Sequence, residues 1–480
     1  MNPLGMFSDL RLKSFDTFQN LFPRSALEGD PVVVIDIDDE SLNIHGQWPW
    51  PRTLVARLVD RTVYSAATGF DIVFAEPDRT GARELSKLYE DNPELVDILS
   101  QTVDSDDILT QSIKNHGTVV LGMAPNNKLN NSLQINKFGL VVQGDAPNQF
   151  LNKYSGIQAN LPSLETASAG IGSMSIGNND PIVRTMPTFE LVNETLVPSF
   201  PLELVRVSIG ASTYQIKSSN ASSEKAFGEA TGINHIKLAD LVMPTNPDGS
   251  LWIYPTATKN LNVIPAWKVL QGEFPLEYFD GKVTIVGTSA SGLLDLRSTA
   301  LEKNIPGVTI VAQFVQQIYA NDFLKRPDWL LGLEFLVGLI ISILICLSIQ
   351  RQGPLGGLGV YIFGSAGILY GSFYFFTTLR YLIDPISPLV ICSLAYLVIT
   401  FFNFLFTELE RKKVRTAFSQ YLAPAMVEKL AQSSESLVLG GERKEMTFLF
   451  SDIRGFTAIS EKYQQDPEGL TELILSLIHI

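Results

Sequence analysis

Cysteine is nearly absent from the chain, which has only two such residues in 480. Both, Cys346 and Cys392, lie inside a strongly apolar block between residues 329 and 407. The first 328 residues therefore contain no disulfide, whichever compartment they face. A segment of that length is large enough to be held together by its own hydrophobic core.

The chain also has fewer basic than acidic residues. The chain has 36 lysines and arginines against 50 aspartates and glutamates, a formal net charge of −14. A surface that binds nucleic acid needs a basic face, so this balance argues against nucleic acid as a partner.

Long uncharged runs are confined to one part of the chain. A spanning helix needs about 20 mostly apolar residues, and three runs of such length follow one another, at about 329–350, 355–379 and 385–407. The alternative is a buried helical hairpin in a soluble core, but three consecutive runs of this kind are rare in soluble folds. The sequence therefore predicts three transmembrane α-helices, in contact with membrane lipid, within residues 329–407.

Charges beside the spans predict the orientation. Four basic residues follow the third run directly, namely Arg411, Lys412, Lys413 and Arg415. The positive-inside rule places that end in the cytoplasm, so three spans place residues 1–328 outside. Glu334 lies one turn into the first run, and we expect it at the outer interface, with its charge satisfied, rather than in a functional site.

An outer domain must be exported, and the first 30 residues do not explain how. They lack the apolar core of a signal peptide. They are instead typical of an amphipathic helix, with Leu10, Leu12, Phe15 and Phe18 at helical spacing. We therefore expect a signal-anchor helix upstream of this sequence.

The outer region alternates strand-like and helix-like segments. Buried strands are predicted at 31–38, 70–74, 117–123 and 282–287, and helices at 52–67 and 308–318. Such alternation indicates an α/β domain with a largely parallel sheet. Residues 125–160 and 211–232, rich in Asn, Ser, Gly and Gln, are expected to be loops or insertions on that scaffold.

Carboxylates gather where the predicted strands end. They are Asp36, Asp38, Asp39, Glu40, Asp71, Glu76 and Asp78. The carboxyl ends of parallel strands are where such folds bind ligands, so these residues are candidates for a ligand or cation pocket. Helix capping and turn formation would account for the same residues and are the stronger alternative.

Several ordered blocks of the outer region resemble the CHASE sensor domain of the second subclass. They include VVVIDIDDESLNIHGQWPWPR, GFDIVFAEPD, PSFPLELVR, LWIYP, FDGKVTIVGTSASGLLDLRSTAL and IPGVTIVAQFVQQI. The resemblance covers about residues 8–325, and its order and spacing carry more weight than any single block. It implies an extracytoplasmic bacterial sensor, in the inner (plasma) membrane, for an unknown ligand.

The segment after the third span combines a helix, an apolar run and a carboxylate. Residues 408–432 read as helical, Met446 to Phe450 as a strand, and Asp452 and Gly455 precede a helix from about Thr457. A carboxylate beside a glycine turn that opens a helix can hold a magnesium ion and a triphosphate. An aspartate in this position is more often a helix N-cap, so the pattern alone is a weak indication.

The full string at this end closely resembles class III adenylate/guanylate cyclases. FSQYLAPAMVEKL and LVLGGERKEMTFLFSDIRGFTAISE carry the resemblance. It implies that Asp452 and the carbonyl of Ile453 bind metal, that Gly455, Phe456 and Thr457 hold the triphosphate, and that the domain is α+β (ferredoxin-like). It also implies two Mg²⁺ or Mn²⁺ ions, ATP as the substrate, cyclic AMP and pyrophosphate as products, and a homodimer.

The remaining functional residues of the cyclase family are missing from the chain. These are a second metal-binding Asp, the purine-reading residues, and an Asn–Arg pair. We therefore assign no catalytic residue and expect the chain as written to be inactive. Adenylate cyclase is favoured over guanylate cyclase only by the architecture, and a non-catalytic membrane receptor that binds a partner remains an alternative.

The predicted organisation has four parts. An outer sensor, 1–328, precedes the three spans, 329–407. A coupling helix and linker, 408–440, then leads to the first part of a cyclase domain, 441–480.

Overall fold

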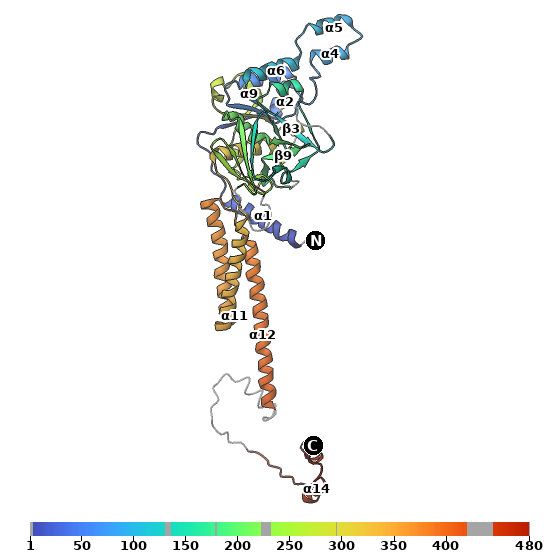
Figure 1. Cartoon of the computed structure of the whole chain (residues 1–480), viewed down its shortest axis with the longest axis vertical. Coiled ribbons are helices and arrows are strands. Elements are labelled where there is room, and N and C mark those ends of the chain that lie inside the picture. Colours follow the sequence, from blue (N-terminus) through green and yellow to red (C-terminus); the bar gives the residue numbers. More distant parts are fainter. Residues whose placement is uncertain are drawn as a thin grey trace. The chain divides into compact units, whose positions relative to one another are not determined.

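The computed structural model describes residues 3–129, 136–177, 180–221, 232–293, 295–419 and 445–479. It divides into two compact units, Met1–Phe404 and Leu405–Ile480. The first contains the outer domain and most of the apolar helices (Figure 1).

A mainly parallel sheet forms the centre of the outer domain, with strands in the order β15-β1-β16-β2-β3 and with β7 and β6 also paired to β3. Only β6 runs antiparallel to its neighbour. The strands are β1 (Val32–Ile37), β2 (Ala67–Phe70), β3 (Val119–Asn126), β6 (Gly156–Gln158), β7 (Gly170–Ser173), β15 (Asn262–Pro265) and β16 (Val283–Thr288). Their apolar runs are continuous because helices cover both faces of a parallel sheet.

Helices cover both faces of this sheet. On one side lie α8 (Phe200–Ser208) and α10 (Gly307–Ala320). On the other lie α3 (Arg52–Arg61), α6 (Ser105–His116), α9 (Ala266–Gln271), with α2 (Asp39–His45) and α7 (Pro162–Ala167) beside them. The predicted α/β class of the outer domain is therefore confirmed.

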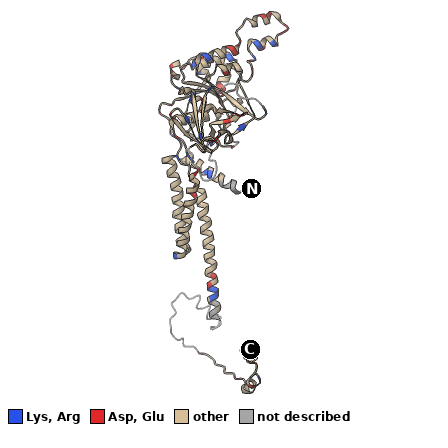
Figure 2. Ribbon diagram, in the orientation of Figure 1, with Lys and Arg blue, Asp and Glu red and all other residues tan. Residues whose placement is uncertain are grey.

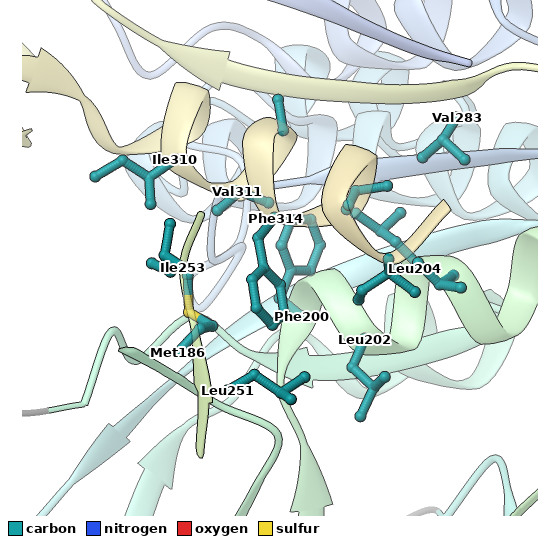
Figure 3. Packing of buried hydrophobic residues seen from close by; sticks show 14 of the residues in the cluster. Met186, Phe200, Leu202, Leu204, Leu251, Ile253, Val283, Ile310, Val311 and Phe314 are labelled. Atoms are coloured by element: carbon teal, nitrogen blue, oxygen red, sulfur yellow. The ribbon is translucent and has the colours of Figure 1, made fainter. Parts of the chain in front are cut away.

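Alternating residues of β1 belong to two separate hydrophobic cores, one on each face of the sheet. Val32 and Val34 belong to the core under α8 and α10, whereas Val33 and Ile35 belong to the opposite core. This is the two-residue period of a strand buried on both faces. Figure 3 shows the first core, where Phe314 of α10 lies against Phe200 of α8.

Smaller sheets extend the domain, and three of their strands, β4, β5 and β11, fall in the segments predicted to be loops or insertions. They contain β4 (Gly139–Gln143), β5 (Lys153–Tyr154), β8 (Thr185–Pro187), β9 (Phe189–Val192), β10 (Thr195–Pro198), β11 (Thr213–Ser218), β12 (Ile233–Leu238), β13 (Leu241–Pro244), β14 (Ser250–Trp252), β17 (Leu296–Arg297) and β18 (Ile305–Pro306). These two segments were predicted to be loops or insertions, and where the structure describes them they are insertions that contain short strands of their own. β4, with the sequence GLVVQ, was missed because it is short and follows residues rich in Asn.

The second predicted strand was placed too late in the chain. β2 spans Ala67–Phe70 rather than 70–74, and α3 ends at Arg61. The strand (ATGF) lacks a run of β-branched residues, because α8 lies too close to Gly69 for a side chain there. A Cβ at Gly69 would lie 2.5 Å from Leu204 Cδ2 of α8, so close packing demands a glycine here.

Two short helices form an outlying pair at the far end of the outer domain from the apolar helices (Figure 1). They are α4 (Ala82–Leu88) and α5 (Pro93–Ser100), which pack on each other. The helix predicted near the N-terminus is confirmed as α1 (Pro3–Leu21).

Among the described residues, two helices are long and apolar enough to cross a membrane, at Trp329–Leu379 and Ile386–Val414. The first is α11, whose backbone leaves helical geometry at Gly353 (φ 74°, ψ −174°), next to Pro354. The second belongs to α12 (Ile386–Ser419). A continuous 51-residue helix would be about 76 Å long, more than twice a bilayer core.

The two segments of α11 pack together and against α12. Ile345 and Ile368, from either side of the break, share a buried cluster with Cys392 of α12. Gly338 lies close to α12, since a Cβ there would be 3.3 Å from Ile391 Cδ1. Small residues permit such close approach between apolar helices.

The second unit contains α14 (Phe456–Lys462) and α15 (Pro467–His479). Helix α14 begins close to its predicted start. The strand prediction for Met446 to Phe450 is wrong, since residues 445–450 have no regular secondary structure. No described strand lies beside this run to pair with it, and a strand needs such a partner. Most of the predicted coupling segment falls at 420–444, outside the described residues.

Candidate functional site

The carboxyl edge of the central sheet brings two of the predicted carboxylates into one row. Asp36 of β1 pairs in register with Gly287 of β16, and the Asp71 N–H donates to the Val286 carbonyl (2.9 Å). By strand alternation Asp36 continues the Val32 and Val34 series, which faces α10. A Cβ on Gly287 would collide with Val308, so the start of α10 lies directly over this row.

Only one of the two side-chain oxygens of Asp36 has a hydrogen-bond partner among the described residues. The Ser289 hydroxyl donates to Asp36 Oδ2 (2.5 Å), whereas the buried Oδ1 has no hydrogen-bond partner among the described residues. Burial raises the pKa of Asp36, and the hydrogen bond from Ser289 opposes part of that rise. The edge of the sheet therefore holds one carboxylate oxygen that could still accept a hydrogen bond.

Asp71 is the most strongly perturbed of the predicted residues. Burial, together with the nearby Asp295 carboxylate, raises its pKa from 3.8 to about 7. Asp295 itself lies at the start of α10, where the Gly307 N–H donates to its carbonyl (2.9 Å), and it forms an ion pair with Arg297 (2.7 Å). Burial disfavours the charged form of Asp71, and a second negative charge nearby adds to that effect.

The other predicted carboxylates have structural roles or are exposed. Asp38 caps α2 by accepting from the Ser41 N–H (2.8 Å). Asp39 accepts from the N–H and hydroxyl of Ser291, which lowers its pKa. Asp78 accepts from the Arg52 N–H (2.7 Å). Glu40 and Glu76 are exposed. Capping and turn formation therefore explain much of the set.

A metal site finds no support in this geometry. Among the described residues, no group of three or more His, Cys, Asp or Glu side chains could hold an ion. The cation-pocket hypothesis for the outer domain therefore rests only on the row formed by Asp36 and Asp71.

The sequence analysis missed several buried carboxyls, and Glu190 is one of them. Glu190 lies in β9, fully buried, and accepts from the Ser173 hydroxyl (2.5 Å), while its Oε1 has no partner among the described residues. Burial raises its pKa against the hydrogen bonds from Ser173, Ser175 and Tyr154. A single Glu inside the short run FELV gives no pattern that would have identified it.

The outer domain is joined to the apolar helices through an aromatic cluster. Phe15 and Phe18 of α1 and Tyr254 are buried together with Phe376 of α11. Ring centroids of Phe18 and Phe376 are 5.8 Å apart. Burial of aromatic side chains on this scale holds the two parts of the unit in fixed contact.

Polar contacts reinforce the same junction. Arg380, which caps the end of α11, pairs with Asp322 just after α10 (2.8 Å). Two backbone hydrogen bonds then join the segments, from Lys325 N–H to the Arg380 carbonyl (2.8 Å) and from Leu382 N–H to the Lys325 carbonyl (2.9 Å). The chain entering the apolar helices is thus paired with the chain that connects α11 to α12.

Glu334 belongs to this junction. It is buried and receives two hydrogen bonds from Arg326 (2.8 and 3.0 Å) and one from the Asp384 N–H (2.7 Å). The expectation that the charge of Glu334 is satisfied is confirmed, and its position at the outer interface stays a prediction.

The turn at residues 452–457 keeps its predicted residues together on the surface. Asp452 Oδ1 accepts from the Ile453 N–H (2.9 Å), and the Phe456 N–H donates to the Ile453 carbonyl (3.2 Å). Gly455 adopts a left-handed conformation (φ 77°) immediately before α14, which favours glycine. Thr457 follows in the first turn of that helix. The structure therefore provides the turn and not a complete pocket.

These features describe an α/β domain that is fixed to apolar helices by an aromatic and ionic junction, the arrangement of a membrane-linked sensor. The model of the CHASE2 domain matches residues 1–349, and the chain belongs to the CHASE2 domain family. This is an extracytoplasmic sensor domain found in signalling proteins. No curated protein and no solved structure matches the chain.

Proposed function

We propose that this chain is a membrane receptor in which the outer CHASE2 domain controls a cytoplasmic adenylate cyclase. The junction between the outer domain and the apolar helices is the observation that carries the proposal. A change in the outer domain that alters the Asp322–Arg380 contact acts directly on the end of α11. The contacts of this junction would then pass a change in the outer domain on to α11.

Three membrane spans complete this topology. The break at Gly353 divides α11 into two segments, each long enough to cross a bilayer, and α12 supplies the third. Arg351 beside the break and the basic residues after Phe404 would both lie in the cytoplasm. The outer domain and the output segment are then on opposite sides of the membrane.

Adenylate cyclase is the proposed output because of the resemblance and the turn at Gly455. Asp452 and the Ile453 carbonyl would hold magnesium or manganese, which stabilises charge on the reacting phosphate oxygens when bound. The turn fits this role, since no described atom lies within 4 Å of a Cβ placed on Gly455. Backbone N–H groups from Gly455 to Thr457 would receive the triphosphate.

The test is an assay of the complete protein, encoded by the natural open reading frame, in membrane vesicles. With ATP and magnesium or manganese we expect cyclic AMP, and Asp452→Ala should reduce it by about a hundredfold or more, because the metal-binding carboxylate is lost. Glu461→Gln, exposed on α14, is the matched control and should retain activity. Cyclic GMP made from GTP instead would identify a guanylate cyclase.

A non-catalytic receptor is the second candidate. The apolar run Met446 to Phe450 is exposed among the described residues, and Phe450 is 93% exposed. In this reading a partner protein covers the run and carries the signal. The candidate is favoured if the complete protein makes neither cyclic nucleotide while the outer domain is correctly folded.

Sensing is tested separately from catalysis. Deleting the outer domain from the complete protein should change cyclase output, because the junction with α11 is removed. Unchanged output would contradict the control function of the outer domain and leave the catalytic assignment intact.

A further inference from the structure

A groove runs along the hairpin that the two segments of α11 form. We call residues 329–352 the first segment and residues 354–379 the second segment. Ile341, Leu344 and Ser348 line the groove from the first segment, and glycines and apolar residues of the second segment form its other wall. Its volume is about 530 Å³, which is within the range of ligand-binding cavities.

Three glycines shape this groove, which we call the α11 groove. A Cβ on Gly356 would lie 2.5 Å from Gln352 Cβ, and one on Gly364 would lie 2.8 Å from Ile341 Cγ2. Small residues allow such close approach between apolar helices. Gly359 also lines the groove, but no described atom lies within 4 Å of a Cβ placed on it. The outer two glycines therefore bring the segments together, and the middle one leaves open space.

The length and polarity of the groove suit an acyl chain. Its lining on the first segment extends from Ile341 to Gln352, a helix rise of about 16 Å. This is about half of a 30 Å bilayer core, the depth that an acyl chain of one leaflet occupies. Leu344 and Phe363 line the groove and are 49% and 81% exposed, so an occupant meets apolar surface along its length.

One end of the groove is polar and has a positive charge beside it. Ser348 and Gln352 line this end, and Arg351 is adjacent to it. Arg351 is the only basic residue in the sequence of α11, and it is exposed. Figure 2 shows basic colour on the hairpin at its end farthest from the outer domain. No carboxylate of the described residues pairs with Arg351, so its counter-charge has to come from elsewhere.

We propose that the α11 groove binds one anionic phospholipid of the cytoplasmic leaflet. An acyl chain lies along the glycines, and the phosphate lies beside Arg351, where the Ser348 hydroxyl and the Gln352 amide can donate to its oxygens. An anionic headgroup is preferred to a zwitterionic one because it brings no cation of its own to Arg351. The proposal rests on the three-span topology proposed above and is independent of the cyclase output.

The test measures which phospholipids remain bound to the full-length chain. The chain is reconstituted in an equimolar mixture of phosphatidylglycerol and phosphatidylcholine, extracted and washed in mild detergent, and the lipid retained per chain is counted by mass spectrometry. We expect phosphatidylglycerol in about fivefold excess, the preference that one basic residue gives for anionic over neutral lipid. Equal retention of the two lipids, or no retained lipid, would overturn the proposal.

Substitutions at the two ends of the site separate the acyl chain from the headgroup. Gly359→Leu fills the open space in the groove, so most of the retained lipid should be lost. Gly371→Leu is the matched control, because that glycine has equal free space but does not line the groove, and retention should be unchanged. Arg351→Gln should retain lipid without the preference for phosphatidylglycerol, and Arg351→Lys should keep the preference. Wild-type retention in Gly359→Leu, or a preference that survives Arg351→Gln, would contradict the proposal.

A helix from a second copy of the chain is the other occupant that this test can identify. Size-exclusion chromatography of the same samples reports the oligomeric state. If Gly359→Leu converts a dimer into a monomer and leaves the lipid content unchanged, the groove is an interface between copies and the proposal fails. Loss of the wild-type chain from the membrane fraction would contradict the three-span topology itself, whereas a failure of lipid binding alone leaves that topology standing.

Discussion

Phe314 and Phe450 are both phenylalanines, but the first is buried and the second is exposed. Phe314 of α10 is fully buried between the central sheet and α8, whereas Phe450, in the apolar run Met446 to Phe450, is 93% exposed. The outer domain buries its apolar residues within the chain, so it carries its own source of stability. The run at 446–450 has no such cover among the described residues, so its burial would need a surface that these residues do not supply.

Two carboxylates, Glu203 and Asp452, show the same contrast between a buried and an exposed side chain. Glu203 of α8 is completely buried, yet Arg206 and the Tyr214 hydroxyl both donate to it (2.6 and 2.9 Å). Asp452 is exposed, and the only described donor to its side chain is the next N–H in the chain. A buried carboxylate held in this way is structural, whereas an exposed one is free to bind a ligand.

The largest effect should come from removing core volume. Phe314→Ala should lower the free energy of unfolding of the outer domain by about 3–5 kcal/mol. Phe450→Ala should change it by less than about 0.5 kcal/mol. Denaturant unfolding of the chain in detergent can be followed by tryptophan fluorescence, since four of the five tryptophans lie before residue 329. Equal effects of the two variants would contradict the comparison.

Breaking a buried ion pair should have the next largest effect. Arg206→Ala leaves Glu203 buried without its cation and should cost about 3 kcal/mol in the same unfolding measurement. The matched control is Arg79→Ala, which removes an exposed pair with Glu76 (3.2 Å) and should cost less than about 0.5 kcal/mol. A loss below 1 kcal/mol for Arg206→Ala would show that Glu203 does not depend on this charge.

The junction should respond more moderately. Asp322→Asn removes the charge opposite Arg380, and we expect amide hydrogen exchange of Lys325 and Leu382 to accelerate by about tenfold, because charged hydrogen bonds contribute about 1.5–3 kcal/mol. Asp240→Asn, at an exposed turn of the outer domain, is the control and should leave both amides protected. Unchanged exchange would mean that the aromatic cluster alone holds the junction.

The smallest effect should be a dependence on pH at Asp71. Its pKa is raised from 3.8 to about 7, so the unfolded chain releases this proton first. Stability is then lost as the pH rises from about 4 to 7, because the folded state must retain a proton or bury a charge. Asp71→Asn should raise the Tm at pH 8 by about 2–4 °C and change it little at pH 4.

Asp39 provides a control of opposite sign for this measurement. Hydrogen bonds from Ser291 lower the pKa of Asp39, so its contribution is present above its unfolded pKa and is lost as the pH falls through the lower, folded value. Asp39→Asn should therefore destabilise the domain near neutral pH and have less effect in acid. The same sign for both variants would contradict the assignment of these two carboxylates.

Local pattern was sufficient for elements with strong hydrophobic runs. β1, β16 and α10 were all predicted close to their observed bounds, because each is mostly apolar. β2 was misplaced because its position depends on Gly69 fitting beneath Leu204, which lies far away in the sequence. The small sheets were missed because their described strands are only two to six residues long and give too short a pattern.

Among candidate site residues, the sequence named Asp36 and Asp71 but could not separate them from the capping residue Asp38. The separation depends on the register of β1, β16 and β2 and on the start of α10, which together place Asp36 and Asp71 in one half-buried row, whereas Asp38 caps a helix. Glu190 was not found at all, since only the packing of β9 against Ser173 gives it a role.

The sequence by itself determined the class of the outer domain, the apolar block after it and the turn residues from Asp452 to Thr457, because these follow from hydrophobic period and from local backbone preferences. Only the tertiary structure decided which carboxylates are buried, how Asp322 meets Arg380, and which aromatic side chains join α1 to α11. Burial and pairing join residues that are distant in the chain, so no local pattern specifies them.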